Sequence, residues 1–272
     1  MQIHSLKAFP RFAVLFSGFF LLMLLGCSSS KELNSVWTNQ ELAITGDGSH
    51  WKDATIEIVG PDVSVGVKND NNYLYVGLVT SNRATQLQML ALGCTAWFDV
   101  EGKKNKTIGI QFPVSGLLQG RRFPAQENQE EFQRMINLAQ QQLAILGPGE
   151  GEQHRLSVQD AAGVEAHLGY VDGTLIYELK IPLQKNKAHV FAVNADMTKP
   201  ILVGFETGDF AAAMKGQPGV SSPSQSAGGG GGRGRSGGRS GGGGTGQGLG
   251  NEMPEPLKHW VTVHLSNGSA QK

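Results

Sequence analysis

The body of this chain is dominated by short runs in which apolar and polar residues alternate. Alternation with a period of two residues is typical of strands that bury one face. Gly, Pro, Asn and Asp residues, which favour turns, separate several of these runs. The pattern predicts an all-β fold, an antiparallel β-sandwich. The predicted strands cover residues 54–59, 63–68, 73–80, 94–100, 106–112, 154–160, 164–171, 174–183, 189–196, 201–206 and 259–265.

One segment, residues 126–146, follows helical spacing instead. Glu and Gln occupy the face opposite its apolar stripe, and Gly147-Pro148-Gly149 provides a stop signal. We expect an inserted amphipathic helix that packs on the sandwich. A partner-binding or membrane-lying helix is the alternative, but the stripe lacks the flanking lysines typical of a helix in the membrane interface. The stripe consists of Phe132, Met135, Ile136, Ala139, Leu143 and Leu146.

A second insertion, rich in Gly, Ser and Arg, covers about residues 217–256. Glycine loses the most backbone entropy on ordering, and this segment has few apolar groups to offset that loss, so we expect it to be disordered. Its G-x-S-x-G match at 234–238 needs a strained turn that such a tract does not hold. We therefore predict one sandwich domain over residues 36–266, interrupted by both insertions, and a tail over 267–272.

The amino terminus carries an export signal. Lys7 and Arg11 precede an apolar run of about 14 residues that ends at Gly26. A helix that spans a membrane needs roughly 20 residues, so residues 1–26 are interpreted as a cleaved signal peptide. The sequence Leu-Leu-Gly-Cys resembles the lipobox of bacterial lipoproteins, which implies acylation of Cys27. An ordinary secretory signal with a chance cysteine is the alternative.

Acylation at Cys27 would attach the mature chain to a lipid bilayer through a tether over residues 27–35. The expected location is the bacterial cell envelope, and Ser28, in place of an Asp, favours the outer membrane. Cleavage removes two basic residues and no acidic residue, which leaves a formal charge of about −2 on a chain that starts neutral. Without a basic excess, no nucleic-acid partner is expected. Cys94 is then the only remaining thiol, and we predict that it is buried as a small hydrophobe.

Carboxylates at the ends of predicted strands are candidate metal ligands. Calcium prefers six to eight oxygen ligands, which loop Asp and Glu residues supply. Asp99 and Glu101, which flank a predicted hairpin loop, are the candidate pair, and calcium is the candidate cofactor. The chain contains no H-E-x-x-H, C-x-x-C or P-loop motif. No catalytic residues are predicted.

Three stretches together resemble family 9 carbohydrate-binding modules and their DOMON-like relatives. The first, residues 43–58, contains Asp47-Gly48 and Trp51. The second, residues 63–80, contains Asn69-Asp70 before Leu-Tyr-Val. The third, Leu-Ile-Tyr-Glu-Leu-Lys-Ile-Pro-Leu at 175–183, resembles a strand motif of the family, although Tyr177 and Glu178 are adjacent here.

This resemblance implies a jelly-roll-like sandwich that is not an enzyme. Sugar-binding members of the family hold a sugar between aromatic rings, and some bind calcium. We expect most aromatic residues of this chain, Trp51 among them, to pack in the fold. Trp97 and Tyr177 are the candidate ligand-binding residues. The predicted function is a lipid-anchored binding module for carbohydrate, and the alternative is an envelope assembly component that docks another protein.

Overall fold

The computed structural model describes residues 31–51, 56–60, 63–116, 128–147, 149, 151–215 and 255–268. The signal peptide, Cys27, the glycine tract at 221–250 and the last four residues lie outside these ranges. Among the described residues, none of the helices is both long and apolar enough to cross a bilayer.

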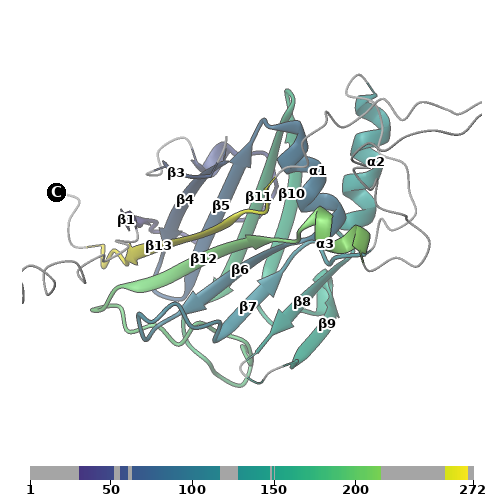
Figure 1. Ribbon diagram of the computed structural model, residues 1–272. Coiled ribbons are helices and arrows are strands. Elements are labelled where there is room, and N and C mark those ends of the chain that lie inside the picture. The colour runs from purple at the N-terminus through teal and green to yellow at the C-terminus, as the bar shows by residue number, and fades with distance from the viewer. Residues whose placement is uncertain are drawn as a thin grey trace, which may run out of the picture. The chain divides into compact units, whose positions relative to one another are not determined.

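Two sheets face each other and form the predicted β-sandwich (Figure 1). Neighbouring strands are antiparallel except for two parallel pairs, β1 with β13 and β2 with β4. The seven strands of sheet A, in spatial order, are β1 (Lys31–Asn34), β13 (Lys258–His264), β12 (Ile201–Thr207), β6 (Cys94–Asp99), β7 (Ile108–Gln111), β8 (Gln142–Leu146) and β9 (Gln153–Ser157). The six strands of sheet B are β10 (Glu165–Val171), β11 (Thr174–Pro182), β5 (Tyr73–Thr80), β4 (Val63–Asn69) and β2 (Val36–Trp37), with β3 (Ile56–Gly60) also paired to β4.

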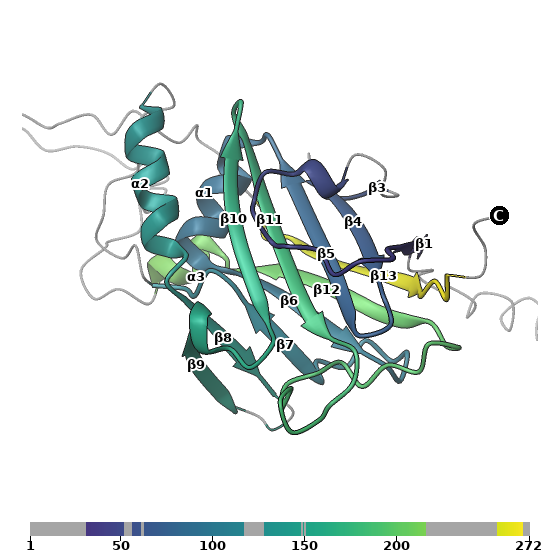
Figure 2. The same cartoon turned by 180° about the vertical axis from the view of Figure 1, so that it is seen from behind.

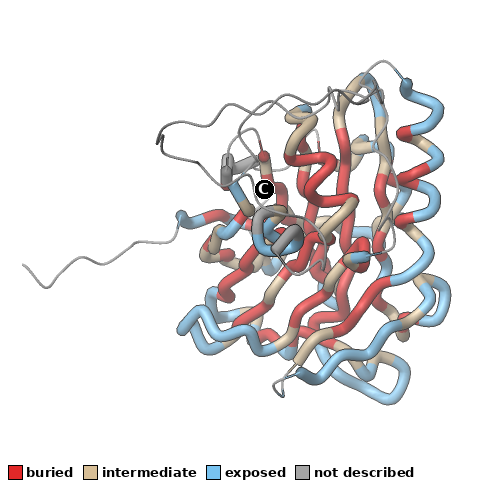
Figure 3. Tube along the Cα trace, turned by 45° about the vertical axis from the view of Figure 1, so that its right-hand side comes forward, coloured by how far each residue is buried: buried red, intermediate tan, exposed pale blue. Residues whose placement is uncertain are grey.

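The core lies between the two sheets, as the buried stretches of the strands in Figure 3 show. Alternate residues of each strand face inward, so Leu175, Tyr177 and Leu179 of β11 are buried there with Phe98 and Cys94 of β6. Cys94 is 0% exposed, which confirms the prediction of a buried thiol. Burial raises the pKa of this thiol to about 12, which keeps it protonated and unreactive at neutral pH.

In the described part of the chain, three α-helices and two 3₁₀-helices accompany the sheets: α1 (Arg83–Leu92), α2 (Gln129–Ala139), α3 (Phe210–Lys215), η2 (Ser49–Trp51) and η3 (Val158–Asp160). The α1 helix, which the sequence pattern did not predict, begins where the Asn82 side chain accepts a hydrogen bond from the backbone N–H of Thr85 at 3.1 Å. It ends at Gly93, whose φ of 80° lies in the left-handed region.

The inserted helix is shorter than predicted. The α2 helix ends at Ala139, and residues 142–146 form β8 instead. Leu143 and Ile145 alternate into the core while β8 pairs with β7 and β9, so strand pairing overrides the helical spacing of this short stretch. As predicted, the α2 stripe is buried, through Phe132, Met135 and Ile136.

Two further predictions differ from the structure. Residues 189–196 do not form a strand, because Asn194 adopts a φ of 59° that interrupts an extended backbone. In the range expected to be a tether, residues 31–34 form β1, which pairs with β13.

A segment that we call the strap, residues 38–51, crosses the outer face of sheet B and ends in η2 (Figure 2). Its apolar residues Leu42, Ile44 and Trp51 pack there against Tyr75 and Ile176. The strap therefore covers a sheet face that would otherwise be open to solvent.

The strap is fixed to sheet B by the buried carboxylate of Glu178 on β11, which is 0% exposed. One carboxylate oxygen accepts the backbone N–H groups of Thr45 at 3.0 Å and Gly46 at 2.7 Å. The other accepts the indole N–H of Trp51 at 2.9 Å. All three donors come from the strap, and the three hydrogen bonds offset the cost of burying the charge.

We predict that Glu178→Gln lowers the free energy of unfolding by about 1–3 kcal/mol, because the amide turns an N–H₂ group toward donors that need an acceptor. Urea denaturation measures this loss, and limited proteolysis reports whether the strap is released. Glu130→Gln is the matched control, since the Glu130 side chain is 89% exposed on α2. Equal stability of the two variants would contradict the proposed role of Glu178.

Candidate functional site

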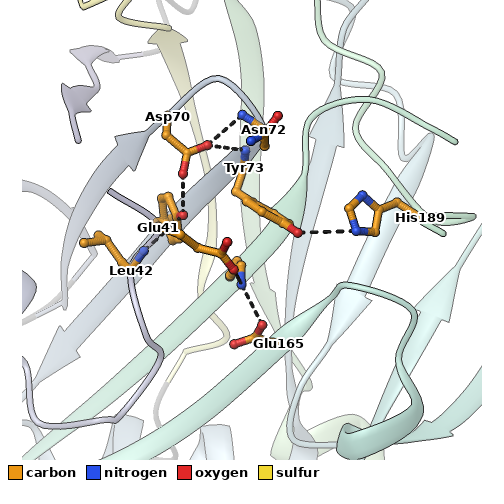
Figure 4. Close-up of polar contacts among 9 residues, drawn as sticks. Glu41, Leu42, Asp70, Asn72, Tyr73, Glu165 and His189 are labelled. Carbon is orange, nitrogen blue, oxygen red and sulfur yellow. Dashed lines mark hydrogen bonds and ion pairs between the residues drawn. The ribbon is translucent and has the colours of Figure 1, made fainter. Parts of the chain in front are cut away.

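A cluster of charged and phenolic groups lies under the strap on sheet B (Figure 4). Asp70 accepts the backbone N–H groups of Asn72 at 2.6 Å and Tyr73 at 2.7 Å, and the hydroxyl of Tyr75 at 2.7 Å. The backbone N–H of Leu42 in turn donates to the Tyr75 oxygen at 3.2 Å. Burial, together with the hydrogen bond to Asp70, raises the pKa of Tyr75 above its ordinary value. The hydrogen bonds of Asp70 and Tyr75 thus hold both the turn before β5 and the strap in place.

Lys180 is the centre of the same cluster, and its side chain is only 4% exposed. Its ammonium contacts the carboxylates of Glu41 and Glu165 and lies 4.3 Å from the centroid of the Tyr73 ring. Burial by itself would lower the pKa of Lys180, but the hydrogen bonds to Glu165 and Glu41 outweigh it and raise that pKa. Lys180 is thus held in its charged form. As a cation it links Glu41 to Glu165, and it has no free electron pair with which to act as a nucleophile.

The outer face of sheet A carries a row of aromatic residues and glycines that crosses four strands. Strand register places Trp260 of β13, Gly204 of β12, Trp97 of β6 and Gly109 of β7 side by side. A Cβ atom at Gly204 would lie 2.7 Å from the Trp260 ring, and one at Gly109 would lie 2.6 Å from the Trp97 ring. Each indole therefore occupies the space above a glycine, and both side chains are only partly buried. We call this row the indole platform.

A second row, of polar residues, runs beside the platform one side-chain repeat further along each strand. It consists of Lys258, Glu206, Thr95 and Gln111 on β13, β12, β6 and β7. Glu206 links the two rows, because its carboxylate accepts the indole N–H of Trp97 at 3.2 Å. We call these four residues the polar row.

Glu206 also pairs with the ammonium of Lys106, whose side chain is 51% exposed. The ammonium lies 5.3 Å from the centroid of the Trp97 ring. Lys106 therefore contacts both Glu206 and the Trp97 ring, and as a half-exposed side chain it can exchange rotamers within nanoseconds.

An open pocket of about 440 Å³ lies over the polar row, at the end of sheet A where β6 begins. The α3 helix lies in front of sheet A at this end (Figure 1). All four members of the polar row line the pocket, and its walls come from Gly93, Ser115, Asp209 and Ala213. Hydroxyl, amide, carboxylate and ammonium groups thus converge beside two indole rings. This combination suits a ligand with apolar faces and hydroxylated edges.

The two predicted ligand-binding residues have different environments. Trp97 lies on the outer face of sheet A, partly buried, in the indole platform. Tyr177 is 0% exposed between the sheets, and its hydroxyl has no hydrogen-bond partner. Its position among the inward residues of β11 gives its ring no access to a ligand in solvent, so the prediction for Tyr177 needs correction.

Asp99 and Glu101, the candidate metal ligands, have different partners in the described structure. Asp99 is fully buried and accepts the backbone N–H groups of Glu101 at 2.8 Å, Lys103 at 2.8 Å and Asn105 at 2.9 Å, so its oxygens organise the loop. Glu101 forms an ion pair with Lys103 at 3.0 Å. Within the described ranges, His, Cys, Asp and Glu side chains form no group of three or more that could hold a metal ion.

Sequence reasoning missed Trp260 and the polar row as site residues. Gly204 and Gly109 were the available signal, since glycine inside a predicted strand often marks a close approach by another group. The row forms only when β13 and β12, separated in sequence by the glycine-rich segment, become neighbours in sheet A.

Comparison with known proteins gives matches only among solved structures. No protein-family model matches this chain, and no curated protein does. The chain is similar to a family 9 carbohydrate-binding module from Caldicellulosiruptor kristjanssonii in complex with glucose, at 10% identity and a TM-score of 0.37, over 66% of this chain and 78% of that one. The complex of such a module with cellotriose gives 11% identity and a TM-score of 0.37, over 67% and 80% of the two chains.

We predict that Gly204→Ala lowers the free energy of unfolding by about 1–3 kcal/mol, because the new methyl group overlaps the Trp260 ring. In a Trp260→Ala background the same substitution should cost much less, since the ring is gone. Urea denaturation of the wild type, both single variants and the double variant measures the coupling free energy between positions 204 and 260. If the losses in the free energy of unfolding of the two single variants simply added up in the double variant, Trp260 would not cover Gly204.

Proposed function

We propose that this protein is a non-catalytic carbohydrate-binding protein and that the indole platform is its binding surface. The observation that carries the proposal is the pair of partly exposed indoles, Trp97 and Trp260, each laid over a glycine beside the polar row. The C–H faces of a pyranose ring pack on indole, and the ring hydroxyls need donors and acceptors at the edge of that contact. Thr95, Gln111 and Glu206 offer such groups.

Pre-formed geometry favours this use of the surface. Each indole has little freedom to turn, because it packs against a strand backbone. The hydrogen bond to Glu206 restricts Trp97 further. A rigid ring loses little conformational entropy when a ligand binds, so the contact area contributes more fully to affinity.

The binding proposal is tested with full-length protein in detergent on a glycan array, followed by titration calorimetry with the glycans that bind. Trp97→Ala and Trp260→Ala should each weaken binding about tenfold or more, equivalent to about 1.4 kcal/mol. Tyr177→Phe is the control, because it removes only a buried hydroxyl without a partner and should leave affinity unchanged. Absence of binding to every glycan would refute the proposal.

The second part of the proposal is that an acyl group on Cys27 holds the protein on a membrane of the bacterial envelope, the outer membrane being favoured. The basic leader, the short apolar run and Leu-Leu-Gly-Cys support it. Only residues 28–30 separate Cys27 from β1, and four residue steps reach at most about 14 Å. An acyl anchor at Cys27 would therefore keep the sandwich close to the bilayer.

We predict that Cys27→Ala abolishes incorporation of labelled palmitate and moves the protein out of the membrane fraction, because acyl chains supply the membrane affinity. Cys94→Ala is the matched control and should keep both the label and the fractionation. Unchanged labelling of the Cys27 variant would refute the anchor and leave the carbohydrate-binding proposal untouched.

A further inference from the structure

Two loops that carry lysines lie at one end of the sandwich. Residues 100–107 join β6 to β7, and residues 183–200 join β11 of sheet B to β12 of sheet A (Figure 1). Because Asp99, the last residue of β6, is paired with Leu202 near the start of β12, both loops meet sheet A at the same place. We call the exposed lysines of the two loops the lysine face: Lys103, Lys104, Lys106, Lys185, Lys187 and Lys199.

The lysine face is a region of positive charge on a chain that is otherwise acidic. The two loops contain six lysines and two acidic residues, Glu101 and Asp196, which leaves a formal charge of about +4. The mature chain is expected to carry about −2, so the rest of it carries about −6. The molecule is therefore electrostatically polarised, and its lysine end attracts anions.

Half of the lysine face is not neutralised by a carboxylate. Three lysines form ion pairs, yet their side chains stay more than half exposed: Lys103 with Glu101, Lys106 with Glu206 and Lys199 with Asp196. Lys104, Lys185 and Lys187 are exposed and form no ion pair with any residue of the described ranges. The neighbouring turn between β8 and β9 contributes Glu152, whose carboxylate contacts His154 at 3.2 Å. Three positive charges thus remain available to a partner.

Both loops are held by hydrogen bonds to their backbones. The buried Asp99 carboxylate accepts three backbone N–H groups of the first loop. In the second loop, the Asn186 side-chain oxygen accepts the backbone N–H groups of Ala188 and His189, both at 2.8 Å. A backbone that is already ordered loses little conformational entropy on contact, which favours binding through the lysines that it presents.

The lysine face lies near the proposed point of membrane attachment. β1, the first strand after Cys27, forms one edge of sheet A, three strand positions from β6, which corresponds to about 15 Å. β1, β13 and β6 run in the same direction, so all three end where the two loops lie. Since the tether from Cys27 reaches at most about 14 Å, a bilayer that holds the acyl group also lies within reach of the lysine face.

The type of cation indicates the type of partner. All six charged groups of the lysine face are ammonium groups, which are compact, strongly hydrated point charges, whereas an Arg guanidinium forms paired hydrogen bonds with a single phosphate. Lysines spread over two loops suit a diffuse attraction to a surface with many anionic headgroups. Such attraction acts within about one Debye length, roughly 8 Å at physiological salt.

We propose that the lysine face contacts the anionic phospholipid headgroups of the membrane that holds the acyl anchor, as a second, electrostatic attachment. This inference rests on the proposed anchor at Cys27 and adds an orientation of the protein on the membrane. The pocket over the polar row lies at the other end of sheet A, where β6 begins, so this orientation places the pocket on the side away from the bilayer.

The test is lysine acetylation read by mass spectrometry, with the acylated protein on vesicles of phosphatidylcholine alone or mixed with phosphatidylglycerol. On the anionic vesicles, acetylation of Lys104, Lys185 and Lys187 should slow about threefold or more, and high salt should reverse this protection by screening. Lys258, which is exposed at the other end of sheet A, is the internal reference and should react equally on both vesicles. Soluble glycerophosphate, added to phosphatidylcholine vesicles at the same phosphate concentration, should protect none of these lysines.

A pair of double variants tests the role of the unpaired charges. Lys185→Gln/Lys187→Gln should remove most of the protection of Lys104, because two of the three unpaired cations are gone. Arg134→Gln/Arg155→Gln is the control with the same loss of charge and should keep the protection, since Arg134 lies on α2 and Arg155 on β9, the edge of sheet A farthest from β1. Thermal unfolding checks that the variants are folded, and the salt dependence of the wild type tests the proposal independently of them.

Vesicle flotation separates this inference from the proposed anchor. If the protein floats with neither type of vesicle, the anchor is refuted and this inference fails with it. If the protein floats with both and the lysine face reacts equally on both, the inference is overturned and the anchor stands. Protection by glycerophosphate equal to that by anionic vesicles, or protection of Lys258 equal to that of the lysine face, would overturn it as well.

Discussion

The buried carboxylate of Glu178 is the group on which the position of the strap depends. It lies on the outer side of sheet B, where a charge without partners would be strongly unfavourable. Thr45, Gly46 and Trp51 of the strap supply the three donors that it needs. The strap thus supplies the donors that Glu178 needs, and Glu178 in turn fixes the strap on sheet B.

The strap makes the two outer faces of the sandwich different. On sheet B, the strap with its apolar residues covers the strands, and Lys180 is closed in by Glu41 and Glu165. On sheet A, the indoles of Trp97 and Trp260 are themselves the covering layer and keep part of their surface exposed. The face that the strap leaves open is thus the one that offers rigid aromatic rings beside polar groups.

The residues that carry the family resemblance prove to be structural. Trp51 donates to Glu178, and Asp70 accepts the hydroxyl of Tyr75 and the backbone of the turn before β5. These contacts fix the strap and the first hairpin of sheet B. These contacts serve the fold of this chain, whereas the candidate binding surface lies on the outer face of sheet A.

The sandwich, most strand positions, the burial of Cys94 and the structural role of Trp51 could be predicted from the residue pattern, because local alternation and turn residues encode which face of a strand is apolar. Three features emerged only from the folded chain: residues 142–146 form a strand, Tyr177 is buried, and Trp260 joins Trp97 in one row. All three depend on how the strands pair. The alternation within one strand does not reveal which of its two faces meets the other sheet, nor which distant strand will lie beside it.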